Sequence, residues 1–172
     1  AMADAAQWKR AGLVGEGKLN AVVTRNIDGL HQAAGSVTVY ELNGSGHRNY
    51  CMKCRQFDGL DFMLKSEGVP RCPVCGGIVK PDVVLYEEAL DTGVMEAAVR
   101  AVSQADLLIV GGTTLVVWPA AGLIRYFSGD SRVLITQGHT HNAPWTAPPI
   151  PPPSPNTLGK RRGASPVALD AW

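Results

Sequence analysis

The sequence predicts an α/β fold, in which helices cover a parallel sheet and a small zinc-binding module is inserted. The first sign is Ala105–Val110, a nearly continuous apolar run of strand length, which is typical of a parallel strand buried on both faces. The second is a set of two cysteine pairs between residues 47 and 77, which interrupts the alternation of strands and helices. A chain of 172 residues can bury one core that carries such an insert.

The elements before the cysteines alternate between helix and strand. Residues 3–17 have apolar spacing that fits a short helix interrupted by glycines. Leu19–Thr24 is a β-branched run that predicts a strand, and it ends in the polar segment Arg25–Gly29. Val37–Leu42 predicts a second strand, which ends in the turn Asn43–Gly46. Open α/β sheets bind ligands at the carboxyl ends of their strands, so these polar segments are candidate site loops.

The four cysteines have metal-ligand spacing. Cys51 and Cys54 form one pair, Cys72 and Cys75 form the other, and seventeen residues separate the pairs. This spacing predicts one tetrahedral Zn²⁺ ion, with each pair on a tight turn that aims two thiolates inward. A closed four-thiolate site has no open coordination position, so the metal would stabilise the fold and do no chemistry. Two disulfides are the alternative, although a reducing compartment would keep the thiols available for metal.

The chain after the cysteines continues the α/β alternation. The expected elements are an extended segment, a helix, a strand, a helix and a strand, in residues 80–86, 90–104, 105–110, 119–125 and 132–136. The turn Gly111–Thr114 follows the apolar strand, and its backbone N–H groups could cradle a phosphate. Many turns between a strand and a helix contain two glycines, so an ordinary connection is the alternative.

The end of the chain has a different composition. Most of the twelve prolines lie beyond Gln137, including the runs Pro148-Pro149 and Pro151–Pro153. Proline removes backbone donors and disfavours regular structure, so we expect residues 137–172 to form a proline-rich, disordered tail. A recognition motif for a proline-binding partner is the alternative.

Charge and hydropathy exclude several classes of partner. The net charge is +1 and the basic cluster Lys160–Arg162 is short, so we expect no direct nucleic-acid partner and no membrane partner. The sequence has no apolar run long enough to span a membrane and no signal-peptide pattern. We therefore expect a cytoplasmic protein.

Five motifs stand in one order within residues 17–136: Thr24–His31, Glu41–Gly44, the two cysteine pairs, Lys80–Val84 and Gly111–Leu115. In this order the chain closely resembles the sirtuins of bacterial type, which are NAD-dependent protein-lysine deacylases. The resemblance implies a Rossmann-like domain that binds NAD, a zinc module inserted into it, and an acyl-lysine peptide in the cleft between them. In this family the acyl oxygen attacks the nicotinamide ribose, nicotinamide leaves, and a histidine acts as general base.

The resemblance assigns the NAD site residue by residue. Asn26, Ile27 and Asp28 match positions that line the nicotinamide pocket. Asn26 and Asp28 are also catalytic candidates. An amide and a carboxylate at a strand end can hold a carboxamide and orient a ribose. His31 matches a supporting hydrogen-bonding residue. The other cofactor-binding matches are Arg25, Gly111, Thr113, Thr114 and Thr136.

The resemblance also implies acylated-lysine proteins or peptides as partners. Val83, Val84 and Tyr86 match the apolar wall of the acyl-lysine tunnel. Glu87 and Glu88 match the edge that pairs with the substrate backbone by strand addition. Ordinary core and surface strand residues are the alternative reading of this segment.

Three side chains depart from the family pattern. Asn43 occupies the position of the general-base histidine, and asparagine takes up no proton near neutral pH, so catalysis should be impaired. His47 belongs to the segment that leads into the zinc module, and we do not expect it to replace the base. Arg25 replaces a glutamine, and its cation would either pair with phosphate or block the pocket. Thr136 replaces an asparagine that contacts the adenosine ribose.

The family's amino-terminal glycine loop and first strand have no counterpart in this sequence. We therefore expect a sheet that lacks a central strand and a weakened hold on NAD. The match ends near residue 136, which is compatible with a frameshifted end. The expected organisation is a partial Rossmann-like domain in residues 1–46 and 78–136, a zinc module in residues 47–77, and the tail.

Two classes of function follow from these features. The first is an NAD-dependent protein-lysine deacylase whose activity is impaired by Asn43 and by the missing glycine loop. The second is a non-catalytic acyl-lysine-binding module or an inactive fragment. The sequence makes no prediction of the oligomeric state.

Overall fold

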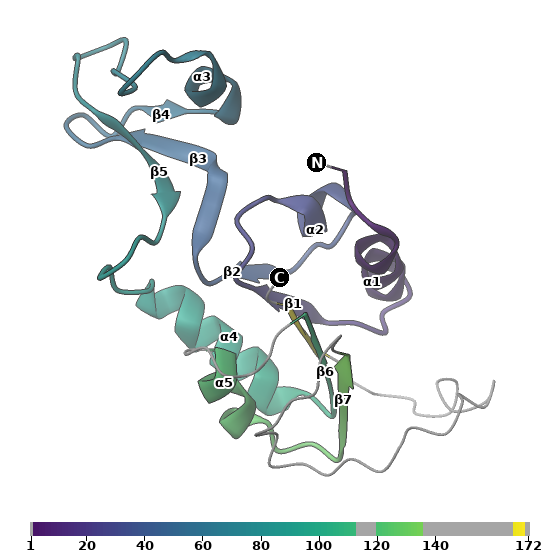
Figure 1. Ribbon diagram of the computed structural model, residues 1–172. Coiled ribbons are helices and arrows are strands. Elements are labelled where there is room, and N and C mark those ends of the chain that lie inside the picture. The colour runs from purple at the N-terminus through teal and green to yellow at the C-terminus, as the bar shows by residue number, and fades with distance from the viewer. Residues whose placement is uncertain (1, 113–119, 136–166, 171–172) are drawn as a thin grey trace.

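The computed structural model describes residues 2–112, 120–135 and 167–170, and it contains two sheets (Figure 1). The larger sheet has five strands in the order β2-β1-β8-β6-β7, and all of its pairings are parallel. Its strands are β1 (Ala21–Thr24), β2 (Val39–Glu41), β6 (Leu107–Gly111), β7 (Ser131–Ile135) and β8 (Val167–Asp170). This sheet with its helices confirms the predicted α/β class.

The centre of the larger sheet is formed by β8, drawn in yellow in Figure 1. On one side Val167 pairs with Ala21 of β1, and on the other side it pairs with Leu108 of β6. The prediction of a disordered tail is therefore wrong for residues 167–170, and so is the prediction of a sheet without a central strand. The physical reason is that a short apolar strand gains backbone partners on both sides and buries both faces. The remaining tail residues, 137–166 and 171–172, lie outside the described residues.

Helices cover both faces of this sheet. On one face α4 (Thr92–Gln104) and the α5–η1 segment (Ala120–Leu123 and Ile124–Tyr126) pack on a core that includes Val23, Leu108 and Leu169. On the other face α1 (Ala5–Gly15) contributes partly buried side chains to a second core around Val22 and Ala168. The odd and even residues of the central strands thus face different cores, as period-2 strand geometry requires.

The longer helices begin at capping side chains. The Asp4 carboxylate accepts a hydrogen bond from the backbone N–H of Gln7 at 2.8 Å, and Gln7 Oε1 accepts one from the backbone N–H of Asp4 at 2.8 Å, which completes a capping box. Asp91 accepts from the backbone of Val94 at 2.8 Å at the start of α4. No helix within the described ranges is long and apolar enough to cross a membrane.

The smaller sheet has three antiparallel strands in the order β4-β3-β5. They are β3 (Gly44–Cys51), β4 (Phe57–Asp58) and β5 (Val79–Val83), and α3 (Leu60–Lys65) lies beside them. The predicted module range, 47–77, contains all four cysteines, while β3 begins before it and β5 ends after it. We call the region from Gly44 to Val83 the cysteine module.

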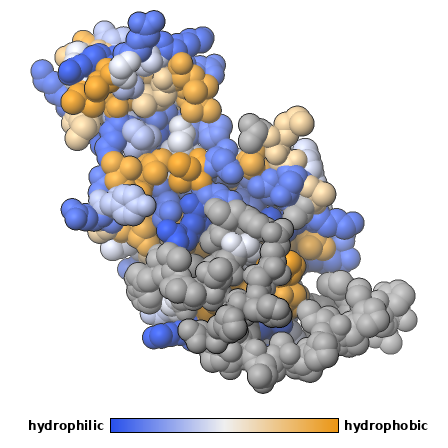
Figure 2. All heavy atoms as spheres, viewed as in Figure 1, coloured by the Kyte–Doolittle hydropathy of each residue, from blue (hydrophilic) through white to orange (hydrophobic). Residues whose placement is uncertain are grey.

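The cysteine module projects from the larger sheet and has its own small core (Figure 1). Cys51, Cys72 and Val79 form this core, and Phe62 and Met63 pack against it. Figure 2 shows apolar surface interspersed with polar surface at this end of the molecule. With so little buried apolar area, the module needs a further source of stability, and its cysteines are the candidates.

We expect Leu169→Ala to lower the free energy of unfolding by about 2 to 5 kcal/mol, because Leu169 is 4% exposed in the main core. Denaturant unfolding measures the effect. Leu64→Ala is the matched control, because Leu64 is 73% exposed and its truncation should cost less than about 0.5 kcal/mol. Equal, small effects of the two substitutions would contradict the placement of β8 in the sheet.

Candidate functional site

The carboxyl ends of the parallel strands meet at one edge of the larger sheet. Arg25 and Asn26 follow β1, while Gly112, with φ of +66°, follows β6. From β1 the chain leads to β2 on one side, and from β6 it leads to β7 on the other, so the strand order reverses between β1 and β6. Such a reversal point is where open α/β sheets bind ligands. Three predicted cofactor residues, Thr113, Thr114 and Thr136, lie outside the described residues.

The loop after β1, residues 25–29, presents polar groups that are open to a ligand. The backbone N–H of Asn26 donates to Thr24 Oγ1 at 3.0 Å. Asn26 Oδ1 and Arg25 Nε are buried, and neither has a hydrogen-bond partner among the described residues. A buried acceptor and a buried donor without partners are costly, and a polar ligand that bound here would satisfy them. The loop therefore fits a ligand that carries both donors and acceptors.

The other predicted residues of this loop are more exposed. Asp28 uses Oδ1 to accept from the backbone N–H of Leu30 at 3.0 Å, and its side chain is otherwise exposed. Ile27 is 40% exposed, whereas His31 is 1% exposed in α2 (Leu30–Ala33). The carboxylate of Asp28 therefore accepts from the first N–H of α2 and remains accessible to solvent.

A cavity of about 620 Å³ brings together residues that the sequence assigned to three different roles. Its lining consists of Arg25, Asn43 and the residues from Val84 to Leu90. The predicted position of the base, one cofactor residue and the substrate residues Val84, Tyr86 and Glu87 thus surround one space. Val83 instead lines a second cavity of about 460 Å³. Asn26, Ile27 and Asp28 lie next to Arg25 in the chain and are not part of either lining.

Two side chains of the 84–90 segment differ from an apolar tunnel wall. Tyr86 is fully exposed, so it forms the rim of the cavity. Glu87 has φ of +68°, which is the left-handed region, and it occupies the turn after β5. Glu88 fixes this turn, because its carboxylate accepts from the Leu85 backbone at 2.9 Å and from Lys80 Nζ at 3.0 Å. The apolar wall predicted for Tyr86 is therefore not formed by the described residues alone.

Asn43 is held in the cavity lining by its backbone. Its carbonyl accepts from the N–H of Val84 at 3.0 Å, which joins the β2–β3 turn to the 84–90 segment. Gly44 has φ of +75°, and a Cβ at this position would overlap the carbonyl oxygen of Asp82. Only glycine allows this close approach of β3 to β5. The turn thus fixes the position of residue 43, while its side chain supplies an amide and no proton acceptor for neutral pH.

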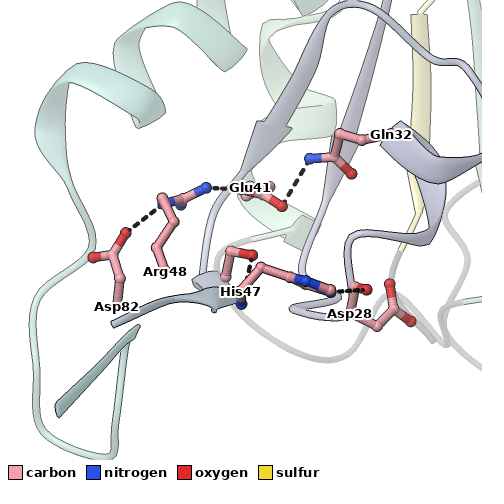
Figure 3. Close-up of polar contacts among 7 residues, drawn as sticks. Asp28, Gln32, Glu41, His47, Arg48 and Asp82 are labelled. Carbon is pink, nitrogen blue, oxygen red and sulfur yellow. Dashed lines mark hydrogen bonds and ion pairs between the residues drawn. The ribbon is translucent and has the colours of Figure 1, made fainter. Parts of the chain in front are cut away.

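The sequence missed the contacts of His47 and Arg48, which Figure 3 shows beside the loop after β1. His47 Nε2 lies 2.8 Å from the backbone oxygen of Asp28. Arg48 forms ion pairs of 2.8 Å with Glu41 and with Asp82. No local pattern could reveal these contacts, because each one joins β3 to a different segment: the loop after β1, β2 or β5.

The four cysteines meet within the cysteine module. Their Sγ atoms all lie within 4.8 Å of one another, with separations of 3.4 Å for Cys51–Cys75 and 3.6 Å for Cys54–Cys72. A tetrahedral ion with metal–sulfur bonds of about 2.3 Å needs sulfurs about 3.8 Å apart, so the cluster has nearly the required size. All four cysteines are free, which favours a metal site over two disulfides.

Both cysteine pairs lie on the same kind of turn. The residue after each pair, Arg55 or Gly76, has positive φ, with values of 62° and 70°. The N–H of Arg55 donates to the carbonyl of Cys51 at 3.0 Å, and the N–H of Gly76 donates to the carbonyl of Cys72 at 2.9 Å. Gly77 then passes so close that a Cβ would lie 2.9 Å from Cys51 Sγ.

The environment of Cys51 favours a thiolate. The N–H groups of Cys54 and Lys53 point at its sulfur from 3.5 and 3.4 Å and lower the pKa of Cys51 to about 6, although burial opposes them. A thiolate is the form that binds metal. The donor set, its size and its glycine packing all fit a closed four-thiolate metal site.

Comparisons with known proteins point to the same family, and the matches cover most of the chain. A sequence model of the Sir2 family matches residues 10–119. The NAD-dependent protein deacetylase of Clostridium acetobutylicum is 59% identical over 138 residues, which cover 80% of this chain and 56% of the relative. The NAD-dependent protein deacetylase of Clostridium perfringens is 62% identical over 125 residues, which cover 72% of this chain and 51% of the relative. The chain therefore spans about half the length of the curated relatives it matches.

Solved structures show the same fold. A Sir2 protein with a p53 peptide and NAD⁺ is 38% identical, with a TM-score of 0.75 over 82% of this chain and 61% of that protein. A Sir2 protein bound to an acetylated peptide is 37% identical, with a TM-score of 0.75 and the same two coverages.

We expect Cys51→Ser to abolish metal binding, because a hydroxyl is a poor ligand for the soft metals that thiolates select. Metal content of the purified protein should fall from one ion per chain to almost none, and the melting temperature should fall with it. Met52→Ser is the matched control, because Met52 lies on the same turn, is 64% exposed and offers no thiolate. Full metal content in Cys51→Ser would rule out the four-cysteine site.

Proposed function

The chain belongs to the Sir2 family, and on that premise we propose that it is an NAD-dependent protein-lysine deacylase whose chemistry is impaired at Asn43. The observation that carries the proposal is the cavity in which Asn43, Arg25 and the 84–90 segment meet. These are the positions that the family resemblance assigns to the base, to NAD and to the acyl-lysine substrate. The deacetylase names of the relatives and the peptide complexes of the structural neighbours support this choice.

The loop after β1 and the end of β6 would hold NAD. When bound, NAD supplies the ribose carbon that accepts the acyl oxygen as nicotinamide leaves. Asn26 offers a buried acceptor without a partner, which suits a carboxamide N–H. Arg25 offers a cation on the lining of the cavity, where it would pair with a phosphate. Gly111 and Gly112 end β6 at the same edge, where backbone N–H groups can face an anion.

An acyl-lysine peptide would bind beside β5. This strand lies at the edge of the smaller sheet, since β3 is its only sheet partner among the described strands. An edge strand can accept a further strand through backbone hydrogen bonds, and Val84 and Glu87 continue from it along the cavity. We propose acylated-lysine proteins or peptides as partners, and neither nucleic acid nor a membrane.

The metal that we propose for the four cysteines is a single Zn²⁺ ion. Four thiolates in a tetrahedral set favour zinc, and they leave no position open for water or substrate. The ion would therefore hold β3 and the 72–77 turn in place and take no part in the reaction. Four reduced thiols suit a reducing compartment, so we propose the cytoplasm as the location.

The amide of Asn43 explains why activity should be low. General-base catalysis by a positioned side chain contributes about 10²- to 10⁴-fold to a rate, and an amide supplies none of it. The backbone of residue 43 is fixed by Val84 and by the close approach at Gly44, so a histidine there would reach the same cavity.

We expect Asn43→His to raise NAD-dependent nicotinamide release from an acetyl-lysine peptide by about 10²-fold or more, because it restores a group that accepts a proton near neutral pH. Release is measured by chromatography against a blank without peptide. Asn20→His, an exposed position before β1, is the matched control and should leave the rate unchanged. Equal rates for Asn43→His and the wild type would contradict the assigned role of residue 43.

A second candidate function is a binder that captures acyl-lysine peptides without chemistry. Asn43 favours it, because removing a base need not remove substrate binding. The peptide-binding edge of β5 and the cysteine cluster do not depend on the side chain of residue 43.

We expect the wild-type chain to bind an acetyl-lysine peptide without NAD and to bind the same peptide with unmodified lysine at least about tenfold more weakly, because burying an ammonium group costs more than burying a neutral amide. Calorimetric titration measures both affinities. Equal affinities for the two peptides would exclude an acyl-lysine binder.

A further inference from the structure

Three residues leave the ladder between β3 and β5. Ser45 pairs with Asp82 and Asn49 pairs with the adjacent Pro81, so Gly46, His47 and Arg48 have no ladder partner on β5. We call these three residues the β3 bulge. Its two ends are fixed, because Ser45 is 2% exposed and Asn49 is 1% exposed. Bulges of this kind redirect side chains away from a sheet and often serve a site.

The β3 bulge holds two successive carbonyl groups of the loop after β1. The N–H of Gly46 donates to the carbonyl of Ile27 at 2.9 Å. The side chain of His47 reaches the carbonyl of Asp28, with Nε2 at 2.8 Å (Figure 3). A carbonyl oxygen can only accept, so Nε2 of His47 carries the hydrogen. The loop that contains Asn26 and Asp28 is thus bound to β3 at adjacent positions.

The ring of His47 also covers Gly29. A Cβ at this glycine would lie 3.0 Å from Cδ2 and 3.2 Å from Nε2 of His47, and Gly29 has φ of +68°. On its other side, the loop is fixed by Asp28, which caps the N–H of Leu30 at 3.0 Å. The imidazole therefore packs on the turn that leads into α2, and it also donates a hydrogen bond to that turn, at the carbonyl of Asp28.

Arg48 anchors the bulge from the opposite direction. Its guanidinium bonds to Glu41 of β2 and to Asp82 of β5, both at 2.8 Å (Figure 3). The other oxygen of Glu41 accepts from Gln32 of α2 at 2.8 Å. The side chain of Glu41 is 8% exposed, so this pairing is partly protected from solvent screening. Arg48 therefore fixes the bulge to β2 of the larger sheet and to β5 of the smaller sheet, independently of the contact between His47 and the loop.

We propose that His47 is a positioning residue for the loop of residues 26–29, and that the β3 bulge couples this loop to the cysteine module. The proposal rests on the NAD-binding role of the loop proposed above. His47 is not part of the lining of the cavity with Asn43, so it acts by holding Asp28 and Gly29. Loss of its hydrogen bond would let the loop open, and binding of NAD would then have to order it again.

The experiment compares His47→Ala, which removes the donor, with His47→Gln, whose amide nitrogen can take the place of Nε2. The first readout is amide hydrogen exchange of Gly46 and Leu30 without NAD, because both N–H groups donate within the held segment. We expect exchange about tenfold faster in His47→Ala, the factor given by loss of one ordinary hydrogen bond, and near wild-type exchange in His47→Gln. The second readout is a titration with NAD, in which the dissociation constant should rise about tenfold in His47→Ala only.

Gln56→Ala is the matched control, because Gln56 is exposed and donates from its side chain to the carbonyl of Phe57 at 3.0 Å, remote from the loop. It should change neither readout. Unchanged exchange in His47→Ala, or equal disruption by His47→Gln and His47→Ala, would overturn the positioning role. If the wild type binds no NAD, the proposed function fails, while the exchange rates still decide the role of His47.

Discussion

The pairing of β8 with both β1 and β6 sets the geometry on which the candidate site depends. The loop that carries Arg25 and Asn26 follows β1, and Gly111 and Gly112 end β6, yet these two strands do not pair with each other. Neighbouring strands lie about 4.8 Å apart, so one strand between them places the two ends about 10 Å apart. The separation of these two candidate site loops is thus determined by a strand of four residues.

The burial of β8 explains how so short a strand can hold this position. Val167 and Leu169 face the core under α4, while Ala168 faces the core with Leu19 and Val22. Like β1, which contributes Val23 to one core and Val22 to the other, the strand contributes to both cores, and it satisfies its backbone on both edges. A strand with free edges and one buried face would have neither advantage.

The sequence predicts the elements whose signals are local. The apolar run at 105–110 predicts a strand and the structure has β6 at Leu107–Gly111, and the helix expected at 90–104 is α4 at Thr92–Gln104. The cysteine spacing likewise predicts the cluster. β8 has no comparable signal, because Val167, Ala168 and Leu169 follow a proline-rich stretch and owe their strand conformation to pairing partners more than 50 residues away in sequence.

The candidate site likewise has features that the motifs predict and contacts that they do not. The motifs assign Asn43 to the position of the base and Val84 and Tyr86 to the substrate, and in the structure all three residues line one cavity. The contacts of His47 are unpredictable, because strand periodicity cannot show where three residues leave a ladder whose register depends on β5. Tyr86 shows the limit of assigning a side chain by motif, since its position fits but its ring is fully exposed.

The structure also shows why the fold can tolerate an amide at residue 43. The hydrogen bond that fixes this turn uses the backbone carbonyl of Asn43, and the residue with positive φ is Gly44. The side chain of residue 43 is therefore not needed to hold the turn. At the cysteine cluster the reverse holds, because each thiolate is itself the contact, and even a Cβ on Gly77 would press against Cys51. On the proposed function, replacing the base costs rate and leaves the fold in place, whereas replacing a proposed metal ligand costs the fold. The intact set of four cysteines therefore bears on the folding of this module, and it carries no information about turnover at residue 43.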